Sequence, residues 1–453
     1  MDAEREADQK QRLADFFDEN LMNNRLSSAI EKVQKLQHAD GSWSWWEGME
    51  GSFFMTVEVS EMLVRLQQMT GPKEECKQML QQSFNYMDKE IVEMVTKMKQ
   101  EERKGHRQSF PTYKALQYLY ISTIDGRALT AKVSEAQNYL KKWLQRDVKN
   151  QTLYEKALSA IILRSHLYVK SLKEYSVYKE NMGRYFDSPR AGYSWRDYRI
   201  PTQVAVIEAL QRLTPKDTKT IDEMRRWLLQ EKRAQAWDTP INSVNAIYAF
   251  LNGNQESLKA QTKTVLKIDG EPLTINEATA GVGYVKTTMS AENKTMFTAE
   301  KKSAGTSWGA VYLQFMQETK DIVDQESEMS VKREILSEKQ QFRLKVGDRV
   351  KVRITIEAKR DLDFVEVIDH RAACMEPISQ LSGYRHGYYC APKDNATHYF
   401  YNMLRKGKHV IETEYYIDRE GVYETGTCVV QCAYAPAFRA TTHSETMKVS
   451  ANN

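Results

Sequence analysis

Hydrophobic positions recur at helical spacing through roughly the first 255 residues. Val57, Leu63 and Leu66 are one example, because positions three and four apart share one face of an α-helix. Polar turns separate such segments, and Asp217 in the turn Thr214–Asp217 is placed to cap the next helix. Helices are predicted up to Asp40-Gly41, around 57–66, and near 73–99, 110–123, 129–146, 151–167, 169–182, 202–213, 218–232 and 240–252.

An aromatic turn, followed by a small hydroxyl residue and an apolar, small-residue helix, occurs three times. It is found at Ser42–Trp46, at Tyr193–Trp195 and at Ala236–Asp238. Trp195 and Trp237 are 42 residues apart, which suits one helical hairpin per repeat. The pattern predicts that short helices rich in alanine form an inner ring and that longer, polar helices form an outer ring.

The period of the pattern changes from 3.6 to 2 after residue 260. Two short β-type runs flank Asp269-Gly270 and predict a hairpin over 264–275. Further strands are expected at 281–288, 295–301 and 308–316, followed by a polar linker over 317–328.

The final segment, about 329–450, alternates most regularly. Val350, Val352 and Ile354 alternate with charged and polar residues, which gives the strand one buried and one solvated face. Glycines at 347, 407 and 421 mark turns. The spacing predicts an antiparallel sandwich of about six to eight strands.

Composition and charge narrow the function classes. The chain has 20 glycines and 10 prolines among 453 residues, well below the usual share of about 7% and 5%, as expected for a largely helical chain. The net charge of +4 is not concentrated in any run of five or more like charges, which argues against nucleic acid as a partner. No window approaches the roughly 18 apolar residues of a membrane span.

The start of the chain and its cysteines leave the compartment open. Met1–Asp8 is charged where a signal peptide is apolar, which fits a piece of a longer protein with its signal upstream. The five cysteines are too few for a disulfide framework. Cys374 and Cys390 flank a loop and are the pair we choose if any disulfide forms.

Three stretches carry a family pattern. Gln37–Trp46 contains a Gln-x-x-Asp-Gly turn followed by aromatics, Arg360–Asp369 forms an acidic and apolar strand start, and Leu404–Gly407 leads through a Gly turn to Tyr434–Phe438. In this order they resemble the C-terminal part of a bacterial α2-macroglobulin family protein. The first is similar to the family's helical thioester-type domain and also occurs in other α/α toroids such as terpene cyclases. The other two are similar to the family's last macroglobulin-like domain.

The resemblance implies a multidomain fold of an α/α toroid followed by antiparallel β-sandwich domains. The expected domains are 1–258 (toroid, thioester-domain-like), 259–328 (β-rich, CUB-like or connecting strands) and 329–453 (macroglobulin-like sandwich). It also implies an extracytoplasmic, bacterial, non-enzymatic protein that recognises or traps proteases. Its partners are proteases or other proteins and the upstream domains of its own parent chain, with no cofactor, metal or nucleic acid.

The thioester that reactive family members carry is absent from this chain. That bond joins a Cys thiol to the Gln three residues on, because both side chains must meet across one helical turn. Cys76 is the only cysteine of the helical part, but position 79 is Met79, and Gln78 is one residue short. Either the motif lies upstream of this chain, or the parent is a member without a thioester.

A carbohydrate-active α/α toroid, either a polysaccharide lyase or a glycoside hydrolase, is the alternative function. Such enzymes need paired carboxylates or a base beside an aromatic cleft. The candidates are Asp40, Glu47, Glu50 and Asp238 beside the tryptophans. The structural alternative is that the rings pack on one another and that Asp40 holds its turn. We favour the latter, because no His, Tyr or Arg joins these acids at a defined spacing.

Other motifs carry little chemistry. Cys390 with His386 and His398 does not complete a four-ligand zinc set, and Asp369, His370 and Ser379 lack a nucleophile-elbow sequence. No catalytic residue is predicted. The candidate partner-contact aromatics are Trp43, Trp45, Trp46, Trp237, Tyr384 and Tyr388.

Overall fold

The computed structural model divides the chain into two compact units. The helical unit comprises Met1–Arg226 and Ile241–Val311, and the sandwich unit comprises Trp227–Pro240 and Tyr312–Asn453. The described residues are 19–146, 151–180, 182–187, 199–234, 240–252, 264–273, 289–290, 292, 295–302, 309, 311–313, 315–337, 344–385, 387–433 and 435–451. Within these ranges, no helix has the length and apolar character needed to cross a membrane.

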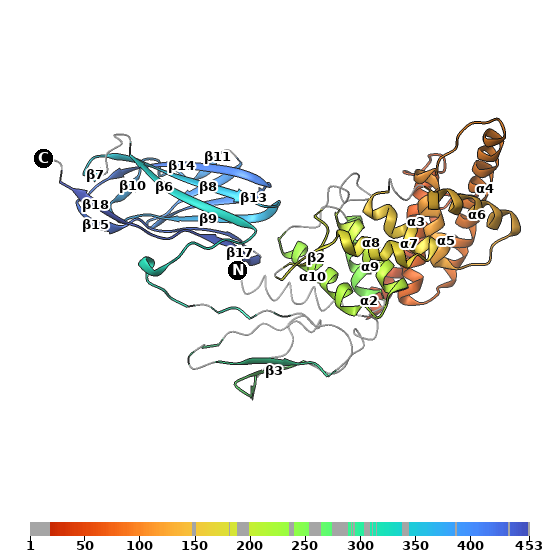
Figure 1. The fold of residues 1–453 in the computed structure, drawn as a ribbon, viewed down its shortest axis with the longest axis horizontal. Helices are drawn as coiled ribbons and strands as arrows, with labels where there is room; N and C mark the ends of the chain where they lie inside the picture. Colours follow the sequence, from red (N-terminus) through yellow and green to blue (C-terminus); the bar gives the residue numbers. More distant parts are fainter. Residues whose placement is uncertain are drawn as a thin grey trace. The chain divides into compact units, whose positions relative to one another are not determined.

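Each predicted stretch contains a helix, but the one predicted over 151–167 ends at Leu163, where Arg164 adopts a φ of +51°, and the next helix begins at His166 (Figure 1). Asp217 Oδ1 accepts a hydrogen bond from the backbone N–H of Thr220 at 3.4 Å, in the predicted capping position. The helices are α2 (Glu19–Lys35), α3 (Phe53–Thr70), α4 (Glu74–Arg103), α5 (Thr112–Asp125), α6 (Ala131–Arg146), α7 (Leu153–Leu163), α8 (His166–Tyr175), α9 (Arg199–Leu213), α10 (Thr218–Ala234) and α11 (Pro240–Leu251).

The helix predicted over 169–182 is wrong beyond Tyr175. The chain instead forms an antiparallel ribbon of β1 (Val177–Lys179) and β2 (Gly183–Tyr185). Val177 and Tyr178 favour extended backbone over helix, and Gly183 adopts a φ of +90°, which a helix cannot accommodate.

Alternate helices pack on one another in the helical unit. α3 packs on α5, α5 on α7 and α7 on α9, while α4 packs on α3 and α6, and α8 on α7 and α9. The small residues of α9 and α11 are buried, as the predicted close packing requires: Ala205, Ala209, Ala246 and Ala249. This alternation agrees with the ring prediction, but a closed toroid stays a prediction.

A small sheet follows the helices along the chain. β3 (Val265–Ile268) pairs with β4 (Glu271–Pro272) as the predicted hairpin, and β5 (Phe297–Glu300) pairs with the other edge of β3. The strand predicted at 281–288 lies outside the described residues, and the described residues of 308–316 form no strand.

The sandwich unit is built from sheets of four, six and three strands, in the orders β10-β14-β8-β6, β11-β12-β13-β9-β16-β17 and β15-β18-β7 (Figure 1). More strands form than the predicted six to eight, because several of them, such as β7 and β10, are too short to show an alternating pattern. The strands are β6 (Met329–Ser337), β7 (Leu344–Lys345), β8 (Arg349–Ala358), β9 (Leu362–His370), β10 (Met375–Pro377), β11 (Gly383–Arg385), β12 (Tyr388–Pro392), β13 (Ala396–Leu404), β14 (Gly407–Ile417), β15 (Gly421–Glu424), β16 (Cys428–Cys432), β17 (Ala435–Thr441) and β18 (Thr446–Ser450).

The core of the sandwich lies where the predicted alternation placed it. Val350, Val352 and Ile354 of β8 are buried. Polar side chains also cross between the two larger sheets, since Tyr399 Oη of β13 hydrogen-bonds to Thr413 Oγ1 of β14 at 2.5 Å. The two sheets therefore face each other over one core.

All five cysteines are free, buried thiols, so the Cys374–Cys390 disulfide is not formed. Cys374 directly precedes β10 of the four-stranded sheet, whereas Cys390 lies in β12 of the six-stranded sheet. The two residues flank a loop in the sequence but belong to different layers of the sandwich.

Candidate functional site

A buried network of charged groups joins the helices of the helical unit. Arg65 of α3 lies between two carboxylates, with Nη1 2.7 Å from Glu61 Oε1 and Nη2 3.4 Å from Glu208 Oε2 of α9. The side chains of all three residues are at most 7% exposed. Arg212, one turn after Glu208, donates to its other carboxylate oxygen at 2.8 Å.

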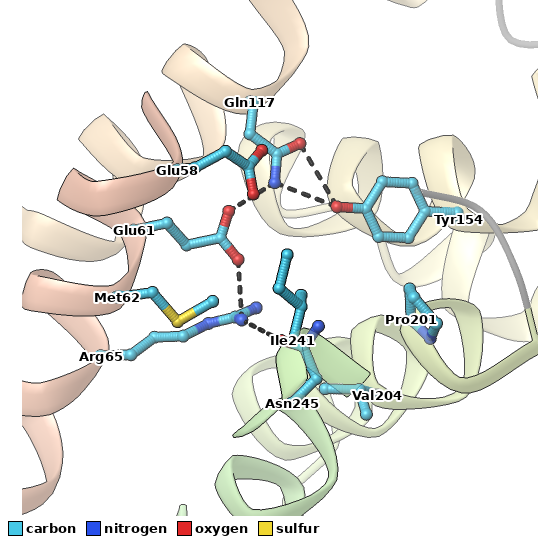
Figure 2. A pocket seen from close by; sticks show the side chains of 10 residues that line it. All are labelled: Glu58, Glu61, Met62, Arg65, Gln117, Tyr154, Pro201, Val204, Ile241 and Asn245. Carbon is cyan, nitrogen blue, oxygen red and sulfur yellow. Dashed lines mark hydrogen bonds and ion pairs between the residues drawn. The ribbon is translucent and has the colours of Figure 1, made fainter. Parts of the chain in front are cut away.

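Neutral polar groups from three further helices complete the network. Tyr120 of α5 donates to Glu208, and Tyr248 of α11 donates to Glu208 Oε1 at 3.0 Å. Asn245 of α11 accepts from Arg65 at 2.8 Å. Gln117 of α5 joins Glu61 to Tyr154 of α7, as Figure 2 shows. Side chains from α3, α5, α7, α9 and α11 therefore meet at one place.

The network keeps the carboxylate of Glu208 ionised. Burial raises the pKa of Glu208. The charges of Arg65 and Arg212 and the hydrogen bond from Tyr120 lower it by a larger amount, so the pKa falls below its usual value. Burial lowers the pKa of Arg65, but Glu61, Tyr120 and Glu208 outweigh it, so that the guanidinium stays charged.

This shift predicts acid sensitivity of the helical unit. Since the folded-state pKa of Glu208 is lowered, its contribution to stability is fully present above the unfolded-state pKa of about 4.3 and is lost as the pH falls through the folded-state value. We expect the difference in unfolding free energy between the wild type and Glu208→Gln to shrink below about pH 4.3. Urea titrations at pH 7 and at about pH 3 measure it; a constant difference would contradict the shift.

The cavity beside this network is small. It has a volume of about 30 Å³ and is lined by Glu58, Glu61, Arg65 and Gln117, among others (Figure 2). That is room for about one water molecule. Of the two acids that line it, Glu61 is bound to both Arg65 and Gln117.

The Asp-Gly turn before α3 has a structural role. Asp40 Oδ1 accepts hydrogen bonds from Ser42 N at 3.0 Å and Ser42 Oγ at 2.7 Å. Gly41 has a φ of +90°, and a Cβ there would lie 2.2 Å from the carbonyl oxygen of Gln82, so only glycine fits. Glu47 and Glu50 are exposed, and Asp238 lies outside the described residues.

The predicted contact aromatics of this turn separate into two groups. Trp43 is only 3% exposed, and its Nε1 donates to Val33 O at 2.9 Å, so it belongs to the core and not to a contact surface. Trp45 and Trp46 are 53% and 70% exposed. Trp45 stacks on Phe54 with ring centroids 5.4 Å apart. Trp237 lies outside the described residues.

The two predicted tyrosines of the sandwich unit differ in the same way. Tyr384 of β11 is exposed, whereas Tyr388 of β12 is half-buried and lines a cavity between the sheets. His398 is 3.0 Å from Glu366, and no group of three or more potential metal ligands occurs among the described residues.

The charged network was missed at the sequence level. Its signal was present in α3, where Glu61 and Arg65 lie four positions apart on a face shared with Val57 and Val64. Charges on an otherwise buried helical face indicate an internal ion pair. Its third member, Glu208, shows the same local signature with Arg212 four positions on, but its link to Arg65, 143 positions away, has no signature in the sequence.

On α4, the side chain beside Cys76 is that of Met79, as the sequence spacing predicts. Cys76 and Met79 of α4 are buried on one face, while Gln78 is exposed. Positions two apart point in different directions on a helix. The Cys76 thiol therefore cannot meet the Gln78 amide within α4.

The second unit can be compared with a known domain. Residues 319–437 match the model of the Bacterial Alpha-2-macroglobulin MG10 domain. The resemblance stated from the sequence is confirmed for this MG10 region. It contains β6 to β16 of the sandwich unit, together with the half-buried Tyr388 and exposed Tyr384.

Several solved α2-macroglobulin structures align with most of this chain, and no curated protein matches it. One is trypsin-activated α2-macroglobulin from Escherichia coli, with 12% identity, a TM-score of 0.46 and coverage of 93% of this chain and 29% of that one. The E. coli protein activated by porcine elastase has 13% identity, a TM-score of 0.40 and coverage of 93% and 38%. The chain thus spans well under half of either protein.

Proposed function

We propose that this chain is the C-terminal part of an α2-macroglobulin-like protein that recognises or traps proteases and is not itself an enzyme. The match of the MG10 region to the bacterial α2-macroglobulin model carries the proposal. Its partners would be proteases and the upstream domains of its own parent chain, in an extracytoplasmic compartment.

The helical unit supports the proposal through its packing. Five alternate helices, α3, α5, α7, α9 and α11, meet in one network, while α4 and α8 pack against their neighbours. This is the arrangement expected of the inner ring of an α/α toroid. We propose a toroid over 1–258, connecting strands over 259–328 and a macroglobulin-like sandwich over 329–453.

We further propose that this chain carries no thioester. The buried Cys76 has Met79 at the position where the acyl partner would be needed. We expect the intact mass of the chain to stay unchanged after incubation with methylamine, because an amine adds to a thioester and frees its thiol. An increase by one methylamine with release of a thiol would contradict this proposal, and a bacterial α2-macroglobulin with a thioester serves as the positive control.

The protease test uses the full-length parent. After incubation with trypsin or elastase, a trap should co-elute with the protease in gel filtration and slow its cleavage of casein while sparing its cleavage of a small peptide substrate. Equal inhibition of both substrates would indicate an active-site inhibitor instead. The proposal would be wrong if casein were cleaved at the uninhibited rate and no co-elution occurred, while the circular dichroism spectrum of the parent protein showed that it is folded.

The carbohydrate-active alternative receives no support from the central cavity. A volume of about 30 Å³ admits about one water and no sugar ring. A glycosidase also needs two carboxylates free to act as acid and base, whereas Glu61, one of the two acids that line this cavity, is bound to Arg65 and Gln117.

A further inference from the structure

The sandwich unit contains a larger cavity between its two facing sheets. It has a volume of about 280 Å³ and lies beside the link that carries the chain from β10 in one sheet to β11 in the other. Lys351 and Thr413 line it from the four-stranded sheet, and Arg385, Tyr388 and Cys390 line it from the six-stranded sheet. A volume just below the usual range of about 300–1,000 Å³ for small-molecule pockets suits one aromatic group.

The floor of this cavity is uncharged and internally satisfied. It consists of the buried residues Cys390, Thr397 and Tyr399. Tyr399 Oη hydrogen-bonds to Thr413 Oγ1 at 2.5 Å, and Thr397 Oγ1 to Tyr415 Oη at 3.2 Å. Burial raises the pKa of the Cys390 thiol, which is therefore neutral near pH 7. Because these polar groups already have partners, the floor favours an apolar or aromatic group.

Tyr388 adds an aromatic wall. Its ring meets that of Tyr399 edge to face, with centroids 5.5 Å apart and an interplanar angle of 85°. Since Tyr388 is only half-buried, part of its ring remains open to a ligand. An aromatic ring placed there would gain an offset or edge-to-face contact in addition to burial.

At the rim of the cavity the acids have basic partners, whereas Arg385 has no acidic partner within the described part of the chain. The acids Glu412 and Glu414 lie 3.2 Å and 3.9 Å from Lys351 Nζ, and Glu412 is also 2.7 Å from Arg353 Nε. Arg385, in contrast, donates only to neutral oxygens within the described part of the chain: Ser379 Oγ at 2.8 Å and Leu381 O at 3.4 Å. A carboxylate is the group that a guanidinium at a cavity mouth binds best.

We propose that this cavity binds a ligand that carries a carboxylate beside an aromatic group, with the ring against Tyr388 and Tyr399 and the carboxylate on Arg385. A polypeptide that ends in phenylalanine and a free aromatic amino-acid derivative share this chemistry. The proposal concerns only the sandwich unit and does not depend on protease trapping.

N-acetyl-phenylalanine is the first probe, tested by equilibrium dialysis against the full chain. A dissociation constant on the order of 1 mM or below is expected for a ligand of this size. Arg385→Gln should weaken binding at least about fivefold, as expected for the loss of a charge-assisted hydrogen bond. Arg405→Gln, an exposed arginine outside the cavity, should leave it unchanged.

Comparing the probe with its amide measures the contribution of the carboxylate to binding. N-acetyl-phenylalaninamide should bind the wild type weakly and should lose nothing further in Arg385→Gln. If the amide binds the wild type as well as the acid does, or if neither binds, the proposal is wrong. Tetraglycyl-phenylalanine distinguishes the two ligand sources, since tighter binding than N-acetyl-phenylalanine supports a polypeptide terminus, and equal binding supports a free small molecule.

Alkylation locates the bound probe. Cys390 is 5% exposed and lines the cavity, and each of the other four thiols is at most 1% exposed. N-ethylmaleimide should therefore modify Cys390 first, and saturating N-acetyl-phenylalanine should slow this reaction, with Cys390→Ser as the control. Binding in dialysis without any effect on Cys390 modification would place the probe elsewhere and overturn the proposal.

Discussion

Replacing Arg65 by methionine is expected to destabilise the helical unit by about 3–5 kcal/mol, because the change leaves buried carboxylates without their shared counter-charge. Arg65 lies between Glu61 and Glu208, and Asn245 loses its hydrogen-bond donor as well. Methionine fills most of the volume of the arginine stem, so the loss is mainly electrostatic.

Urea unfolding followed by tryptophan fluorescence measures this effect, since six of the eight tryptophans belong to the helical unit. Arg107→Met, at an exposed loop arginine, is the control and should change stability by less than about 0.5 kcal/mol. The combined variant Glu61→Gln, Arg65→Met, Glu208→Gln should be more stable than Arg65→Met alone, because it removes the buried charges together. A single Arg65→Met variant as stable as the wild type would show that the network is not formed.

The second large effect is expected at Asp369 of the sandwich unit. Asp369 of β9 is completely buried, with Oδ1 2.6 Å from Arg333 Nε of β6 and Oδ2 3.4 Å from Tyr415 Oη of β14. Burial raises the pKa of Asp369, and the charge of Arg333 limits the rise. Asp369→Ala leaves the buried guanidinium of Arg333 without its counter-charge and should lower the free energy of unfolding by about 3–5 kcal/mol.

Hydrogen exchange with mass spectrometry resolves this loss in peptides from β8, β9 and β14. Exchange in these strands should accelerate by two orders of magnitude or more, as about 3 kcal/mol implies. The matched control is Glu412→Ala, which removes an exposed partner of Arg353 and should cost no more than about 1 kcal/mol. Equal exchange in the two variants would refute the special role of Asp369.

Local patterns were sufficient to predict most elements. The alternation at Val350, Val352 and Ile354 predicted β8 and its buried face, and the Asp269-Gly270 turn predicted the hairpin of β3 and β4. The ribbon after Tyr175 was missed because its two strands have only three residues each, too few to interrupt a helical pattern. Short strands carry little periodicity, so their formation depends on tertiary pairing.

The candidate sites were harder to predict because they depend on distant residues. The turn at Asp40 could be interpreted locally, but whether Trp43 or Trp46 faces solvent depends on what packs over them. The partners of Arg65 lie 143 and 180 positions away in Glu208 and Asn245. The cavity at Arg385 likewise requires two sheets to face each other, which no window of sequence contains.

The network also has a consequence during synthesis of the chain. Asn245 leaves the ribosome 180 residues after Arg65, a delay on the order of 10–40 s at bacterial-type translation rates of about 5–20 residues per second. Through this interval, Glu61 lies one turn before Arg65 on the same helix and can neutralise it before any later helix arrives. The i, i+4 pair is thus the one part of the network that α3 can form by itself before α9 and α11 are made.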